Sequence, residues 1–175
     1  MKITFVRHGE TEHNKTGRIT GEIDADLNDE GIAQAEQLAK EIPSEFDCIY
    51  TSTLKRARDT ANIVNGKLSL PVIVSSLIVE RHFGSLAGKS WSDAEVLYPN
   101  VRDLDKKQEY DFQPFGGESA KDVRTRLFAF IDEVKQGPYT HPLVITHGGI
   151  LRMLHFLHAK EMGHIANASL HTFEF

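Results

Sequence analysis

Short apolar runs alternate along the chain with longer segments in which apolar residues recur at helical spacing. The short runs are typical of buried strands, because they are rich in β-branched residues and bounded by polar or turn-forming residues. They predict strands over residues 2–6, 48–51, 71–74 and 143–146, and an alternating pattern predicts another over residues 170–175.

The segments between these runs show apolar residues three or four positions apart, which is the spacing of one helix face. A helix is predicted over residues 29–42, because Asn28 or Asp29 can cap its start and Pro43 marks its end. Residues 101–117 have no clean period, and we expect irregular structure in them. Further helices are predicted over residues 54–66, 90–98 and 119–134 and from the glycines at 148–149 to about 159.

This alternation of strands and single helices predicts an α/β fold. Parallel strands need crossover connections, and a helix after each strand supplies them. We therefore expect a three-layer sandwich in which a mainly parallel sheet carries helices on both faces. The chain has 175 residues and no internal repeat or linker, so we expect one domain, residues 1–175.

The composition excludes several classes of function. Residues are 40% hydrophobic and 26% charged, as in ordinary soluble globular proteins. The net charge of −5 argues against sequence-independent binding to nucleic acid, which depends on excess Lys and Arg. An anionic ligand would therefore need a local cluster of basic residues.

The single cysteine, Cys48, and the distribution of apolar residues bear on the compartment. One cysteine forms neither an internal disulfide nor a CxxC motif, which suits a reducing compartment. No apolar run approaches the roughly 18 residues of a membrane span, and charge interrupts the first residues too early for a signal peptide. We expect a cytoplasmic protein without a membrane partner; the oligomeric state is left open.

Basic residues and histidines follow three of the predicted strands. Arg7 and His8 follow the first strand, Arg56 lies just after the second, and His147 follows residues 143–146. Ligands of open α/β sheets bind at the carboxyl ends of the strands, so these four side chains are expected to converge.

Two guanidinium groups and two imidazoles suit a dianionic phosphoryl group. Arginine presents forked donors that match phosphate oxygens, and neighbouring positive charge keeps a histidine neutral and therefore nucleophilic. The reaction also needs a proton donor for the leaving oxygen, and Glu80 is the best-placed carboxyl group.

Five sequence blocks resemble the histidine phosphatase superfamily, the phosphoglycerate mutase-like proteins, and they occur in the family order. The blocks are RHGET at 7–11, TSTLKRA at 51–57, ERHFGSLAG at 80–88, GGES at 116–119 and THGG at 146–149. The resemblance implies that His8 accepts the phosphoryl group, that Arg7, Arg56 and His147 hold its oxygens, and that Glu80 protonates the leaving group.

The resemblance also implies further substrate-binding positions, and we expect no cofactor or metal ion because the arginines supply the charge that a metal ion would otherwise provide. These positions are Asn14, Thr20, Gly21 and Gly148. The predicted function is hydrolysis of a phosphate monoester of a small metabolite, such as a sugar phosphate or ribazole phosphate, through a phosphohistidine. We expect specificity to come from residues 85–117, where Lys89, Arg102, Lys106 and Lys107 could meet a second anionic group.

Other functions stay open at this point. One is phosphoryl transfer of the cofactor-dependent phosphoglycerate mutase type, although the arginine-rich insertion of those mutases has no match here. Another is a non-catalytic phosphate- or nucleotide-binding regulator. Residues 84–90 resemble a P-loop, but three residues separate the glycines where the pattern needs four. The histidines at 155, 158, 164 and 171 lack the HExxH or cysteine ligands typical of a zinc site.

Overall fold

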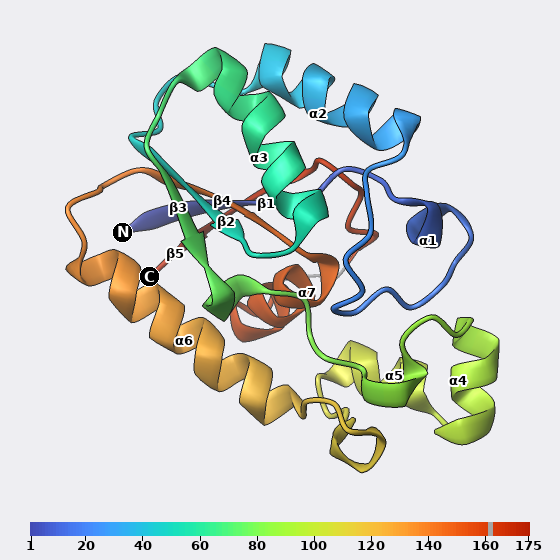
Figure 1. Ribbon diagram of the computed structural model, residues 1–175. Coiled ribbons are helices and arrows are strands. Elements are labelled where there is room, and N and C mark those ends of the chain that lie inside the picture. The colour runs from blue at the N-terminus through green and yellow to red at the C-terminus, as the bar shows by residue number, and fades with distance from the viewer. Residues whose placement is uncertain (161–162) are drawn as a thin grey trace.

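A five-stranded sheet forms the centre of the computed structural model, which describes residues 1–160 and 163–175 (Figure 1). The strand order is β3-β2-β4-β1-β5, and every neighbouring pair is parallel except β1 and β5. The prediction of a mainly parallel sheet is confirmed. The strands are β1 (Lys2–Arg7), β2 (Cys48–Ser52), β3 (Val72–Ser75), β4 (Pro142–Thr146) and β5 (Leu170–Glu174).

Helices cover both faces of this sheet, as the three-layer prediction requires. Helices α2 (Asp29–Glu41) and α3 (Lys55–Leu68) lie on one face, and α6 (Ala120–Gln136) and α7 (Gly148–Leu157) lie on the other (Figure 1). Successive strand residues point to opposite faces, so the sheet contributes to two separate apolar cores. In β4, for example, Val144 belongs to the core under α6 and α7.

Helix ends follow the capping residues of the sequence in most places. The Asn28 side chain accepts a hydrogen bond from the Gly31 N–H at 2.8 Å, and Ser119 forms a capping box at the start of α6. The helix predicted to end near Gly66 continues two residues further, to Leu68. Glycine weakens a helix interior by only about 1 kcal/mol, and here the helix stops where Ser69 turns left-handed.

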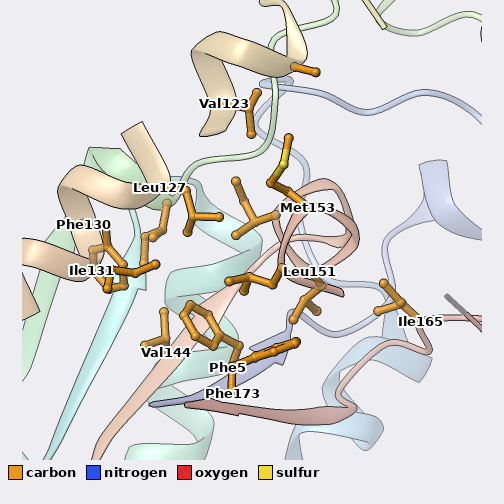
Figure 2. Close-up of a cluster of buried hydrophobic side chains, with 14 of the residues drawn as sticks. Phe5, Val123, Leu127, Phe130, Ile131, Val144, Leu151, Met153, Ile165 and Phe173 are labelled. Carbon is orange, nitrogen blue, oxygen red and sulfur yellow. The ribbon is translucent and has the colours of Figure 1, made fainter. Parts of the chain in front are cut away.

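The larger core lies between α6, α7 and the sheet. Figure 2 shows Leu127 and Phe130 of α6 facing Leu151 of α7, with Phe5 and Val144 of the strands closing the cluster from the sheet side. These side chains are fully buried, and burying such a side chain contributes about 1.5–3 kcal/mol. The carboxyl ends of β1 and β4 are therefore held on a rigid base.

The segment that lies between β3 and α6 along the chain is built differently from the sheet and its helices. Residues 85–117, here called the lid segment, contain α4 (Trp91–Leu97), α5 (Val101–Lys107) and 3-10 turns (Figure 1). The expectation of irregular structure from residue 101 is wrong for α5. With seven residues and few apolar positions α5 has no detectable period, and it is held instead by the burial of Val101 and by an ion pair of Asp105 with Arg81.

The remaining elements are short. The structure adds the one-turn helix α1 (Glu12–Lys15) after β1 and the 3-10 turns Ser76–Ile78, Gly84–Leu86 and Gln113–Phe115. Within the described ranges, no helix combines the length and the apolar character needed to cross a membrane.

Candidate active site

His8 lies directly after β1 and is buried. Its Nδ1 is 2.6 Å from the carbonyl oxygen of Gly9. Because a carbonyl only accepts hydrogen bonds, Nδ1 carries the proton and the lone pair of the neutral ring lies on Nε2. The Nε–H of Arg56 donates to this Nε2 at 3.1 Å. The site therefore holds an imidazole with a defined tautomer, whose Nε2 lone pair accepts the hydrogen bond from Arg56.

The surroundings of His8 keep it neutral. Burial lowers the pKa of His8 well below 6.5, and the positive charges of Arg56 and Arg7 lower it further. The pKa of His147 is lowered well below 6.5 in the same way, first by burial and then by Arg56. Both rings are thus uncharged near pH 7, and their centroids are 5.1 Å apart.

Arg56 is brought to the site by the first turn of α3 and is completely buried. Its Nη1 and Nη2 donate to the carbonyl oxygens of Ile23 at 2.8 Å and Gly21 at 2.7 Å. One turn later, Thr60 accepts a hydrogen bond from the Gly9 N–H at 3.0 Å and donates to the Arg56 carbonyl at 2.7 Å. Arg56 therefore fixes the loop of residues 20–23 relative to the loop that carries His8 and Gly9.

His147 caps α7 after β4, and its Nε2 is 2.8 Å from the Ser52 hydroxyl at the end of β2. The Ser52 oxygen also accepts a hydrogen bond from the Leu54 N–H at 3.3 Å, and its hydroxyl can either donate to His147 Nε2 or accept from it. Among the described residues, the buried Nδ1 of His147 has no hydrogen-bond partner.

Arg7 ends β1 and is anchored by a 2.6 Å hydrogen bond from Nη1 to the Ile165 carbonyl. Its Nε is buried and has no partner within the described part of the chain. Burial and then the charge of Arg152 lower the pKa of Arg7 to about 10, so the guanidinium stays protonated at neutral pH. Arg7 therefore supplies a fixed positive charge beside His8.

Glu80 reaches the same place from the loop that precedes the lid segment. One carboxyl oxygen accepts from the Arg81 N–H at 2.9 Å, and the other accepts from the Gly149 N–H at 3.1 Å. A Cβ at position 149 would lie 2.1 Å from a Glu80 oxygen, so only glycine allows this approach. The second glycine of the THGG block thus seats the carboxyl group.

A pocket of about 100 Å³ brings most of the predicted site residues together. His147 is the exception, because it lies beside His8 without lining the pocket. Thr20 has a buried hydroxyl without a partner among the described residues, and it faces this pocket. The predicted residues in the lining are Arg7, His8, Asn14, Thr20, Gly21, Arg56, Glu80 and Gly148.

The pocket also contains residues that the sequence reasoning did not assign to it. Arg18 and Arg152 line it, and Trp91 reaches it from the lid segment. The signal for Arg152 was its position four residues after Gly148, which places both on one face of a helix that starts at the site. His82 does not line the pocket; its Nε2 lies 3.8 Å from a carboxylate oxygen of Glu22.

The histidines near the C-terminus lie elsewhere. His155 and His171 contact each other, with 2.9 Å between ring nitrogens, and His158 packs on Phe173. Across residues 1–160 and 163–175, no group of three or more His, Cys, Asp or Glu side chains is arranged to hold a metal ion.

An α/β sandwich with a neutral histidine between arginines at its strand ends defines a class of phosphoryl-transfer proteins, and comparison with known proteins identifies the family. Over residues 3–175 the chain matches the histidine phosphatase superfamily (branch 1). The chain belongs to this superfamily.

Named relatives and solved structures agree with this assignment. The chain is 34% identical to a metal-independent phosphoserine phosphatase of Arabidopsis thaliana, covering 98% of this chain and 75% of that protein. It is also 34% identical to a 2,3-bisphosphoglycerate-dependent phosphoglycerate mutase of Bradyrhizobium diazoefficiens, covering 87% and 78%. The structure of a mycobacterial glucosyl-3-phosphoglycerate phosphatase with VO3 superposes with a TM-score of 0.85 at 25% identity, covering 98% of this chain and 91% of that chain.

Proposed function

We propose that this protein is a phosphatase that hydrolyses phosphate monoesters of small metabolites through a phosphohistidine at His8. The observation that carries the proposal is the state of the His8 ring. Its Nδ1 proton is held by the Gly9 carbonyl at 2.6 Å, and its Nε2 lone pair faces Arg56. A neutral imidazole in a cationic pocket is a nucleophile suited to a phosphate monoester.

In the first step, His8 Nε2 attacks phosphorus while the bond from phosphorus to the ester oxygen breaks. The charge on the transferring group would be balanced by Arg7 and Arg56, and a ring N–H of His147 would donate to one of its oxygens. Catalysis of phosphoryl transfer relies mainly on such positioning and electrostatic stabilisation. Asn14, Thr20, Gly21 and the N-terminus of α7 at Gly148 surround the same pocket and support binding of the phosphoryl oxygens.

Glu80 is proposed to manage the proton in both steps. As a carboxylic acid it donates a proton to the leaving oxygen in the first step. In the second step the resulting carboxylate takes a proton from water, whose oxygen attacks phosphorus as the bond to Nε2 breaks. Inorganic phosphate leaves and His8 returns to its neutral form. The two backbone hydrogen bonds from Arg81 and Gly149 support this role, because they hold the carboxyl group at the pocket.

The names of the relatives support a small phosphorylated metabolite as the substrate. Phosphoserine phosphatase and glucosyl-3-phosphoglycerate phosphatase are both named for such compounds. We also propose that residues 1–175 act as one domain and that the protein works in the cytoplasm. The family match across residues 3–175 supports the first point, and the single cysteine supports the second.

The second candidate function is a phosphoglycerate mutase activity, which relatives such as that of Bradyrhizobium diazoefficiens favour by name. A mutase keeps water away from its phosphohistidine, whereas a phosphatase admits water to it. Incubation with 3-phosphoglycerate and a catalytic amount of 2,3-bisphosphoglycerate separates the two. The phosphatase predicts that release of inorganic phosphate exceeds formation of 2-phosphoglycerate, and the reverse ratio would overturn it in favour of the mutase.

A further inference from the structure

A second and larger pocket, of about 290 Å³, adjoins the phosphoryl pocket. Trp91 and Arg152 line both pockets, so the two are continuous at these side chains. Ile165, whose carbonyl anchors Arg7, lines the second pocket as well. A substrate whose phosphoryl group lies at His8 would therefore extend its other end into this adjoining pocket.

The charge of the adjoining pocket is positive. Arg102, Lys106 and Arg152 line it, and Asp105 is the acidic residue among the lining residues that the structure describes. Asp105 is already neutralised, because it forms an ion pair with the buried guanidinium of Arg81. The neighbouring positive charges hold the pKa of Asp105 below its usual value despite burial. The pocket thus offers an excess of cationic groups to a ligand.

Arg152 occupies the boundary between the two pockets. A Cβ atom placed on Gly148 would lie 3.8 Å from Arg152 Nη1 and 3.5 Å from Arg7 Nε, so both arginines reach the same side of Gly148. On the other side, Arg152 Nε is 3.9 Å from an Asp105 oxygen. Among the described residues, Arg152 donates no hydrogen bond, which leaves its forked N–H groups available to a ligand.

Trp91 and Arg102 lie side by side in the wall of the adjoining pocket. The Arg102 guanidinium lies 5.9 Å from the Trp91 ring centroid and forms a 3.0 Å hydrogen bond to Glu95. These contacts engage Arg102 with Trp91 and Glu95, whereas Lys106 is largely exposed. The charged residue that is best placed to select a ligand is therefore Arg152.

We propose that the adjoining pocket binds a second anionic group of the substrate, either a carboxylate or a second phosphate, and that Arg152 selects it. The proposal rests on the proposed function only in that the substrate is a phosphate monoester. Arginine binds either anion with two parallel hydrogen bonds, so the two sources share this chemistry. Because Arg152 lines both pockets, the substrate should carry its two anionic groups a short distance apart.

Matched pairs of phosphate monoesters test this directly. Phosphoserine and phosphoethanolamine differ only by a carboxylate, and fructose 1,6-bisphosphate and fructose 6-phosphate differ by a second phosphate. We expect kcat/KM to be about tenfold to a hundredfold higher for at least one doubly anionic member, as expected for a charge-assisted hydrogen-bonded pair. The pair with the larger ratio identifies the source of the second anion.

The variants Arg152→Met and Arg152→Lys identify the residue responsible. Methionine keeps most of the bulk and removes the charge, so the ratio within the selected pair should fall toward one. Lysine keeps the charge without the fork, so an intermediate ratio is expected. Arg58→Met is the matched control, because Arg58 is an exposed arginine of α3, and it should keep the full ratio.

Isothermal titration calorimetry on the His8→Ala protein measures the Kd of each monoester without turnover. The ratio of the two Kd values within each pair then reports the preference for the second anion. If no monoester is hydrolysed, the proposed function fails, while the Kd ratios still decide this inference. Ratios near one in both pairs would overturn it. Equal losses for both members of a pair in Arg152→Met would overturn it too, because Arg152 would then serve only the phosphoryl group.

Discussion

The edge of the sheet and the lid segment meet at one pocket but are built in opposite ways. At the sheet edge, His8 and His147 follow buried parallel strands and are themselves almost fully buried. The lid segment consists of short helices and turns, with left-handed residues at Asn100 and Gln108 and an exposed apolar residue at Val96. The sheet edge is rigid by packing, whereas the lid segment depends on a few specific contacts.

The contact that joins the two regions is centred on Arg81. Its guanidinium is buried between the rings of Phe83 and Tyr110, 4.7 Å from each centroid, and pairs with Asp105 of α5. Arg81 is also the neighbour of Glu80, whose carboxyl group it binds through its backbone N–H. The nucleophile and the phosphoryl-binding groups therefore lie at the sheet edge, while the lid segment anchors the neighbour of Glu80 through Asp105 and contributes to the adjoining pocket.

Replacing Glu80 separates the proton donor from the phosphoryl-binding groups. Glu80→Gln should lower kcat/KM for alkyl phosphates by about a hundredfold to ten-thousandfold, the usual worth of general acid catalysis. Aryl phosphates should lose far less, because an aryl oxide leaves without a proton. Steady-state rates on phosphoserine and p-nitrophenyl phosphate measure the difference. Glu133→Gln is the control, since Glu133 is an exposed residue of α6 outside the pocket. Equal losses on both substrates for Glu80→Gln would remove Glu80 from the acid role.

Removing Asp105 breaks the contact between the lid segment and the sheet edge. Asp105→Ala leaves the Arg81 charge buried and unpaired, and breaking such a pair typically costs about 3–5 kcal/mol. Urea unfolding should report a loss of that size in the free energy of unfolding. Asp103→Ala on the same helix is the control, because its contact with Lys106 is solvent-exposed. A similar stability for both variants would show that the buried pair does not anchor the lid segment.

Part of the pH dependence of stability should come from the sheet edge. His8 and His147 have lowered pKa values in the folded protein, so below about pH 6.5 only the unfolded chain takes up these protons. The free energy of unfolding should therefore fall as the pH drops from 7 to 5.5. Each histidine contributes up to about 1.4 kcal/mol per pH unit over this range.

Urea unfolding at pH 7.0, 6.0 and 5.5 measures this fall. In His147→Asn the fall should be smaller, because one buried neutral ring is gone. A stability that stays constant over this range in the unaltered protein would mean that the two rings are protonated when folded, against their assignment as neutral groups.

Removing metal ions should have the smallest effect. Arg7 and Arg56 supply the positive charge that a metal ion provides in other phosphoryl-transfer sites, so turnover should be unchanged after dialysis against EDTA. An activity that disappears and returns only with zinc or magnesium would contradict the arginine-based site.

The sequence predicted the sheet edge far better than the lid segment. Strand runs such as residues 143–146 are continuous and apolar, and the residues after them fall at the edge by topology alone. The lid segment gave a weaker signal, because α5 is seven residues long and is held by the buried Arg81 and Asp105 rather than by an apolar stripe. A charged pair of this kind joins residues far apart in sequence and leaves no periodic pattern.

The same limit applied to single contacts within the site. Two contacts form only in the assembled fold: Glu80 accepts from the Gly149 N–H, and His147 contacts Ser52. Arg152 was detectable in principle, because it lies one helical turn beyond Gly148. Its connection to the adjoining pocket depends on where Trp91 and α5 come to lie, and no local pattern encodes that.

The most direct test of the account is to trap the phosphorylated residue. The protein should be mixed with a labelled phosphate monoester, quenched within milliseconds under alkaline conditions that preserve phosphohistidine, and digested for mass spectrometry. We predict an alkali-stable phosphoryl group on His8, absent from His8→Ala and still present in His141→Ala, an exposed histidine outside the site. Label on another residue, or turnover by His8→Ala at the rate of the unaltered protein, would contradict the account.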